Sequence, residues 1–207
     1  MASRELRSDA IVNRDRIVEA ARAELSQSNG ASADLRLHRV AKSAGVAQGT
    51  LYRHFPTREH LLAEVYRHEL TQLVEAVAPL LAEHPPLRAL ACWMQRLIDY
   101  ARVKRGVMAA IEASVWQDLY SGQHHRLDEA LGALLDQGKA AGQVRAEVDA
   151  ADVILLLGAL SRIPEPEWDT RAPTIVAVII DGLRPIESTT GPSDSPETGP
   201  SGATGDG

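Results

Sequence analysis

The chain has 207 residues, and with 44% hydrophobic residues it is long and apolar enough to bury at least one core. A formal net charge of −6 excludes a uniformly basic surface, yet residues 1 to 60 carry ten Lys and Arg against seven Asp and Glu, so the cationic part is N-terminal. The single cysteine, Cys92, excludes an internal disulfide, and no apolar run approaches a membrane helix or signal peptide, so we expect a cytoplasmic protein.

The first predicted elements are helices. Aromatic residues are few, and apolar residues recur three and four positions apart through most of the chain, which predicts an all-α protein. Residues 1 to 13 are expected to form a flexible arm. A first helix is predicted over about 14 to 28 and a second over about 37 to 44, where Gly45 ends it.

A long helix is predicted after Pro56, where Thr57 can cap it. It should continue to the prolines that follow His84, and it is expected to link two domains. Amphipathic patterns then predict three further helices, over about 88 to 103, 106 to 120 and 124 to 142, separated at Gly106 and at Ser121-Gly122.

Two later segments, 151 to 163 and 174 to 183, are evenly apolar and flank a proline-rich loop. They offer too little polar surface for lone exposed helices, so we expect a partner to cover them. Residues 187 to 207 are rich in Gly, Pro, Ser and Thr and are predicted to be disordered. The chain is therefore divided into a first domain over 14 to 60 and a second over 61 to 186.

The most informative motif covers about residues 36 to 55. Gly45 ends one helix and begins a short turn, and Gln48 to His54 form about two helical turns before Phe55-Pro56. Helix, glycine turn and second helix make a helix-turn-helix, whose second helix enters the major groove of DNA.

The side chains of this second helix divide into two faces. Val46, Leu51 and Phe55 are spaced to pack inward, and Gly49 leaves room for close approach to DNA. One alternative places Tyr52 in the core, and another makes the outer face merely solvated. The groups expected to face outward, suited to phosphate oxygens and base edges, are Gln48, Thr50, Tyr52, Arg53 and His54.

The stretch LHRVAKSAGVAQGTLYRHFPTREHLL strongly resembles the TetR family of bacterial transcriptional regulators. Its Ala-Gly-Val turn, its Gly-Thr-Leu-Tyr segment and the aromatic residue before Pro-Thr-Arg-Glu carry the resemblance, which covers about residues 14 to 66. The resemblance implies an all-α fold with an N-terminal three-helix DNA-binding domain and a C-terminal domain for ligand binding and dimerisation. No catalytic set, phosphate loop or metal-ligand cluster is evident, so we expect no enzyme activity, cofactor or metal.

Carried over by position, the family pattern places Gln48 and Thr50 near the bases and Tyr52 and His54 mainly on phosphates. The same pattern implies further phosphate contacts by Arg58, at the start of the long helix, and by Arg36 and Arg39.

Two positions depart from the family pattern, because Ala47 and Arg36 stand where capping Ser or Thr is common. Capping at these helix starts must use the backbone, water or Asp34.

The resemblance also implies a pocket in the second domain whose occupant alters the spacing of two DNA-reading heads. The alternative for each candidate is ordinary core packing. Aromatic and Met side chains suit a flexible apolar ligand, and the candidate lining residues are Trp93, Leu97, Tyr100, Met108, Ile111, Trp116 and Tyr120.

The two evenly apolar segments form the expected homodimer surface, as a four-helix bundle with their symmetry mates. Such a symmetric dimer would bind a palindromic operator on double-stranded DNA. The candidate interface residues are Ile154, Leu155, Leu157, Gly158, Ile175, Val178 and Ile179.

These expectations favour a repressor that a small effector releases from its operator. An activator or architectural DNA-binding protein of the same fold is the first alternative. A helical carrier or enzyme that uses only the C-terminal pocket is the second.

Overall fold

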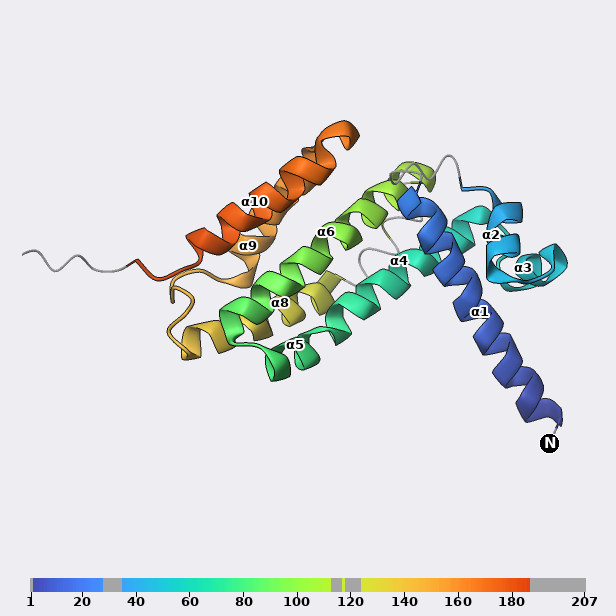
Figure 1. Ribbon diagram of the computed structural model, residues 1–207, viewed down its shortest axis with the longest axis horizontal. Helices are drawn as coiled ribbons and strands as arrows, with labels where there is room; N and C mark the ends of the chain where they lie inside the picture. Colours follow the sequence, from blue (N-terminus) through green and yellow to red (C-terminus); the bar gives the residue numbers. More distant parts are fainter. Residues whose placement is uncertain (1, 28–34, 113–116, 118–123, 187–207) are drawn as a thin grey trace, which may run out of the picture.

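The computed structural model describes residues 2–27, 35–112, 117 and 124–186, and all the regular structure among them is helical (Figure 1). The predicted all-α class is therefore confirmed. Asp34, Trp116, Tyr120 and the predicted tail, 187 to 207, lie outside the described residues.

Three helices make the N-terminal head: α1 (Ala2–Gln27), α2 (Leu37–Ala44) and α3 (Gln48–His54). The bounds predicted for α2 and α3 are confirmed. The predicted start of the first helix near residue 14 is wrong, because α1 already begins at Ala2 and includes most of the expected arm. The sequence has no Gly or Pro between Ala2 and Gln27, so no helix-breaking residue separates the expected arm from the rest of α1.

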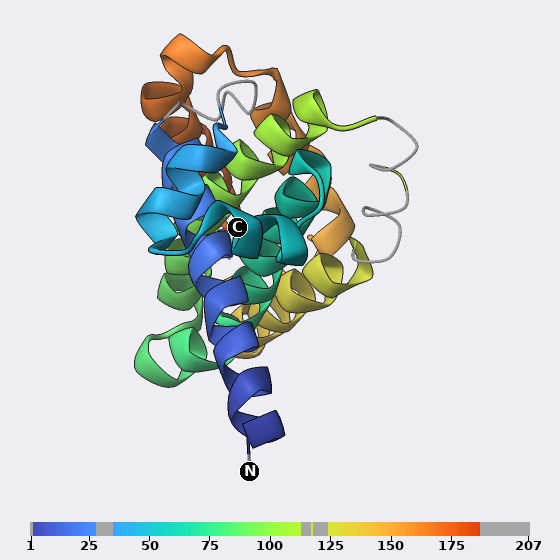
Figure 2. The same ribbon diagram turned by 90° about the vertical axis from the view of Figure 1, so that its right-hand side faces the viewer.

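The rest of the described chain forms a helical body. Helices α4 and α6 pack side by side along it, and α10 lies on the other side of α6 (Figure 1). Figure 2, a view toward the head, shows α1 passing in front of the body, with its N-terminal part projecting past the body. The body elements are α4 (Arg58–Glu75), α5 (Val77–Glu83), α6 (Pro86–Ala110), α8 (His124–Ala140), α9 (Ala150–Leu157), η2 (Gly158–Arg162), η3 (Glu165–Glu167) and α10 (Trp168–Gly182).

Two predicted boundaries near α4 and α6 are wrong. The long helix does not continue to His84, since it breaks at Ala76 between α4 and α5. Pro79 explains the break, because it lacks the N–H that would bond to Glu75 and its ring crowds that carbonyl. Conversely, α6 continues through the buried Gly106. One glycine costs a helix only about 1 kcal/mol, which packing can offset.

The proline-rich segment before α10 also differs from its prediction as a loop. The predicted helix over 151 to 163 is α9 followed by a 3-10 turn, and α10 begins at Trp168 rather than near 174. The indole of Trp168 is buried, with the Arg105 guanidinium 4.4 Å above its ring. Arg105 also pairs with Glu165, and Arg102 pairs with Asp169 at 2.7 Å. These contacts attach the segment to α6, and they join residues too far apart in the sequence for local patterns to predict.

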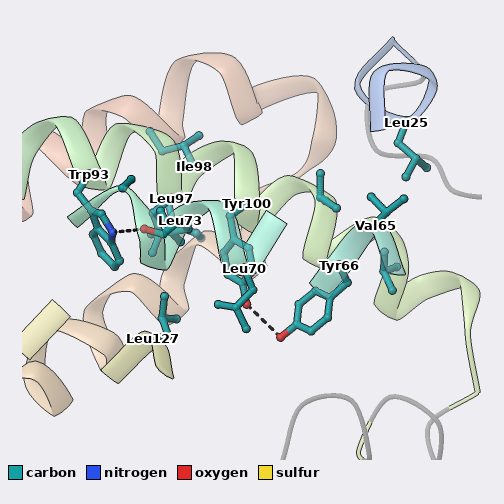
Figure 3. Close-up of a cluster of buried hydrophobic side chains, with 14 of the residues drawn as sticks. Leu25, Val65, Tyr66, Leu70, Leu73, Trp93, Leu97, Ile98, Tyr100 and Leu127 are labelled. Carbon is teal, nitrogen blue, oxygen red and sulfur yellow. Dashed lines mark hydrogen bonds between the residues drawn. The ribbon is translucent and has the colours of Figure 1, made fainter. Parts of the chain in front are cut away.

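The core between α4 and α6 contains two buried polar contacts. The indole Nε1 of Trp93 donates to the Leu73 carbonyl at 2.9 Å, and the Tyr100 hydroxyl donates to the Tyr66 hydroxyl at 3.1 Å (Figure 3). Because each of these polar atoms has a partner, the hydrogen bonds offset the cost of removing the aromatic side chains from water. They hold α6 against the helix that begins at the head.

The turn between α2 and α3 depends on Gly45. Its φ of 66° lies in the left-handed region, and its N–H bonds to the carbonyl of Lys42 at 3.1 Å. A Cβ at this position would stand 2.6 Å from Nη2 of Arg16. Gly49 has the helical backbone of α3, and a Cβ added there would meet no atom within 4 Å. The two glycines therefore meet different constraints.

We expect Gly45→Ala to lower the free energy of unfolding by about 1–2 kcal/mol, because a Cβ is strained at positive φ and the Arg16 side chain must move. The matched variant Gly49→Ala should leave it unchanged or raise it by up to about 1 kcal/mol. Urea unfolding followed by circular dichroism measures both. Equal stability of the two variants would contradict this account of the turn.

Candidate nucleic-acid interface

The base of α3 is apolar, as the sequence predicts. Leu51 and Phe55 are buried and Val46 is half-buried against the core. The Arg14 guanidinium of α1 lies 5.2 Å from the centre of the Phe55 ring, within the range of a cation–π contact. Phe55 therefore fixes the end of α3 against α1.

The opposite face of α3 is polar and accessible. Gln48, Gly49, Tyr52 and Arg53 are exposed, and Thr50 and His54 are half-buried. Half of the Tyr52 surface is accessible, at 50%, so the alternative that Tyr52 fills the core is wrong. The structure thus brings the six predicted residues of α3 together on one short helix.

Arg53 is already engaged within α3. Its Nε donates to the Gly49 carbonyl at 3.2 Å and its Nη2 to the Thr50 hydroxyl oxygen at 3.1 Å. The Thr50 hydroxyl accepts this bond and keeps its own proton for donation to an acceptor on DNA. Arg53 consequently orients Thr50, a role that its position on the outer face did not predict.

The three other predicted arginines occupy different surroundings. Arg36 is exposed at the start of α2, and Arg39 pairs with Glu24 of α1 at 2.9 Å. Arg58 is half-buried at the start of α4, and its Nε and Nη2 are buried without a hydrogen-bond partner. A guanidinium in this state gains from an anion that reaches it.

The starts of the helices account for the two departures in capping. Neither Arg36 nor Ala47 makes a side-chain cap, and backbone bonds such as Thr50 N–H to the Ala47 carbonyl, at 2.9 Å, begin the helices instead. Thr57 caps α4 as predicted, accepting from the His60 N–H. A second hydrogen bond, between the Thr57 side chain and the Glu59 carboxyl, is the main cause that lowers the pKa of Glu59.

Helix α2, the turn at Gly45 and the short polar helix α3 on its apolar base together form a helix-turn-helix. Comparison with known proteins identifies the family. Residues 17–65 match the model of the tetR family of bacterial regulatory proteins. Residues 85–185 match the model of the SbtR-like transcriptional regulator C-terminal domain.

Solved structures agree with these family matches. The TetR transcriptional regulator SCO0520 from Streptomyces coelicolor is 38% identical, with a TM-score of 0.73 over 83% of this chain and 98% of that chain. A TetR transcription regulatory protein from Mycobacterium vanbaalenii is 30% identical, with a TM-score of 0.66 over 87% and 99%. The chain therefore belongs to the TetR family of transcriptional regulators. Because this family consists of regulators, the expectation that the chain is not an enzyme is confirmed.

A match to a curated relative is shorter. The HTH-type transcriptional regulator SAB2452 from Staphylococcus aureus is 38% identical over 69 residues, which are 33% of this chain. The chain thus spans only 36% of that relative's length. No helix in the described part of the chain is long and apolar enough to span a membrane.

The predicted lining of an effector pocket is packed into the core in this structure. Trp93, Leu97, Tyr100 and Ile111 are buried, and Met108 is exposed. The polar atoms of Trp93 and Tyr100 are occupied by α4, as described above. For these buried residues the structure shows core packing, and their role toward a ligand stays a prediction.

The predicted dimer residues lie on an accessible apolar surface. Leu155 is 79% exposed, Val178 is 67% exposed and Gly158 is exposed. Ile154, Leu157 and Ile175 are half-buried, whereas Ile179 is buried within the protomer. The exposed Leu156, which the predicted set did not include, belongs to the same α9 surface.

Two polar cavities between the head and the body were not predicted. They measure about 160 and 300 Å³ and share Arg22, Glu69 and Asp99 as lining residues. Each residue comes from a different helix, α1, α4 and α6 respectively, so no local pattern in the sequence brings them together.

Proposed function

We propose that this TetR-family regulator is a dimeric repressor, which leaves a palindromic operator when a small, largely apolar effector binds. The exposed polar face of α3 carries the DNA-binding part of the proposal. Thr50 and Gln48 offer groups for base edges, and Tyr52 and His54 offer donors for phosphates. DNA contact also implies that the protein works in the cytoplasm.

Arg58 extends this surface to the start of α4. Its half-buried guanidinium stands at the positive end of an 18-residue helix, which favours a phosphate at this point. Arg36 adds an exposed cation at the start of α2. Arg39 would have to share its guanidinium with Glu24, so we assign it a smaller part.

The α9 and α10 surface supports the dimer. Several large apolar side chains project from it, and it lies on the far side of the body from α3 (Figure 1). Exposed apolar side chains gathered on adjacent helices mark an association site. A two-fold dimer formed there would carry two α3 helices and suit an operator with two half-sites.

Release by an effector requires that the helical body has a second conformation, which does not fit the operator. An effector shifts the equilibrium only if it binds the DNA-free conformation more tightly. FadR from Bacillus subtilis, at 15% identity and a TM-score of 0.58, was solved with stearoyl-CoA. That likeness concerns the fold alone. For this protein we place the effector near Trp93, Leu97 and Tyr100, where repacking would move α6 relative to α4.

The double variant Thr50→Ala with Tyr52→Ala tests the DNA-binding site. It should lose about ten- to a hundredfold in affinity for a bound genomic fragment, because it removes groups assigned to base and phosphate contacts. Fluorescence anisotropy at fixed salt measures the affinity. Thr170→Ala, an exposed threonine of α10, is the control and should bind as the wild type does. Wild-type affinity in the double variant, with its helicity intact, would exclude this surface.

The variant Leu155→Glu tests the dimer. A charge placed in an apolar interface loses its hydration, so the protein should become monomeric. Light scattering after size exclusion gives the mass. Ile11→Glu, which changes an exposed apolar residue of α1, should remain dimeric. A Leu155→Glu protein that stays dimeric would move the interface to another surface.

Deletion of the gene tests repression. Genes next to bound fragments should be expressed more strongly in the deletion strain than in the wild type. Reporter fusions measure the change, with the same promoters lacking the bound sequence as controls. Lower expression after deletion would favour the activator alternative.

A further inference from the structure

The end of α1 meets α4 and α6 where the head joins the body (Figure 1). Arg22 of α1, Glu69 of α4 and Asp99 of α6 line both of the polar cavities at this junction. Motion of the head relative to the body must change the distances from Arg22 to the other two residues.

Arg22 makes contacts within α1 and across to α4. Its Nη2 and Nε donate to Glu19 Oε1 of the same helix at 2.8 and 3.1 Å, and its Nε also lies 3.4 Å from Glu69 Oε1. The Glu69 side chain is only 11% exposed, whereas that of Arg22 is 40% exposed. The pair therefore connects a largely buried carboxylate in the body with an accessible cation of the head.

The charges around Glu69 come from all three helices. Glu19 and Arg22 face it from α1, His68 lies beside it on α4, and Asp99 approaches from α6. Arg96 and Arg102 of α6 line the adjoining cavities. Burial raises the pKa of the Glu69 carboxyl, Arg22 and His68 oppose the rise, and Glu19 and Asp99 add to it.

We propose that Glu69 positions the DNA-reading head through Arg22, and that protonation of Glu69 weakens this contact and makes operator binding depend on pH. The proposed repressor function does not require a pH-dependent head position. The inference does rest on that function in one respect, which is DNA binding by the head. Glu69 is a positioning residue, since it lies in the body rather than on the α3 surface.

The physical basis is a redistribution of one cation among three carboxylates. A neutral Glu69 no longer attracts Arg22, which stays with Glu19 and the nearby Asp99. One ion pair between α1 and α4 is then lost, while the Arg14–Glu64 pair, at 2.8 Å, remains. The head loosens without detaching, so the two α3 helices of a dimer are held less firmly at the operator spacing.

The direction of the pH effect follows from the raised pKa. At high pH Glu69 is ionised and holds Arg22, and the contact weakens as the pH falls through the raised pKa. A falling pH also adds positive charge to the protein as a whole, which strengthens DNA binding in general. A variant with the same change in net charge therefore provides the reference.

The experiment compares full-length wild type, Glu69→Gln and Glu75→Gln on one genomic DNA fragment that the wild type binds at about pH 8. Glu75 is an exposed carboxylate at the end of α4, so its variant matches the change in net charge. At about pH 8, Glu69→Gln should bind about two- to fivefold more weakly than Glu75→Gln, since the loss of one partly exposed ion pair weakens binding only modestly. The ratio should fall toward one as the pH is lowered through the raised pKa of Glu69.

Arg22→Gln provides a second variant in case Glu69→Gln fails to fold, as judged by circular dichroism. It should weaken binding at high pH by a similar factor, and the double variant should be no weaker than either single one. Two results would overturn this inference but leave the repressor proposal standing. One is an affinity ratio between Glu69→Gln and Glu75→Gln that does not change with pH. The other is an additive effect of Glu69→Gln and Arg22→Gln in the double variant. Failure of the wild type to bind any fragment would overturn the repressor proposal and this inference with it.

Discussion

The DNA-reading surface depends on the burial of Leu51 and Phe55 beneath a helix of only seven residues. An isolated helix of this length is not stable in water, and α3 has no side-chain cap at its start. Its position is therefore set by its base and by the left-handed turn at Gly45. The contacts that the exposed residues of α3 can make with DNA therefore depend on this packing.

Arg14 connects this base to the body. Its guanidinium lies over Phe55 and also pairs with Glu64 of α4, so one side chain of α1 contacts the end of α3 and the helix that leads into the C-terminal domain. Further along α1, Arg22 makes the corresponding contact with Glu69. The head is thus joined to α4 by charged contacts at two levels, in addition to the apolar core that α1 shares with α4.

Local sequence signals predicted the head well and the body less well. The bounds of α2 and α3 follow from a glycine turn and a Phe-Pro break, both of which act within a few residues. Prolines in the body show the limit of such signals, because Pro79 breaks a helix while Pro173 lies inside α10. Tertiary contacts explain the second outcome, since Trp168 is buried beneath Arg105 and holds the start of α10 on α6.

Trp93 and Tyr100 show another limit, because aromatic residues on one helix face suit a core and a ligand pocket equally. The cavities at Arg22, Glu69 and Asp99 join three helices, and no periodicity within one helix could reveal them.

The central claim is that a symmetric dimer reads DNA with two α3 helices. Hydroxyl-radical footprinting of the full-length protein on a genomic fragment that it binds tests this claim most directly. We expect two protected half-sites related by two-fold symmetry, with centres about one duplex turn or somewhat more apart. A single unsymmetrical protected segment, or protection that does not depend on sequence, would contradict it.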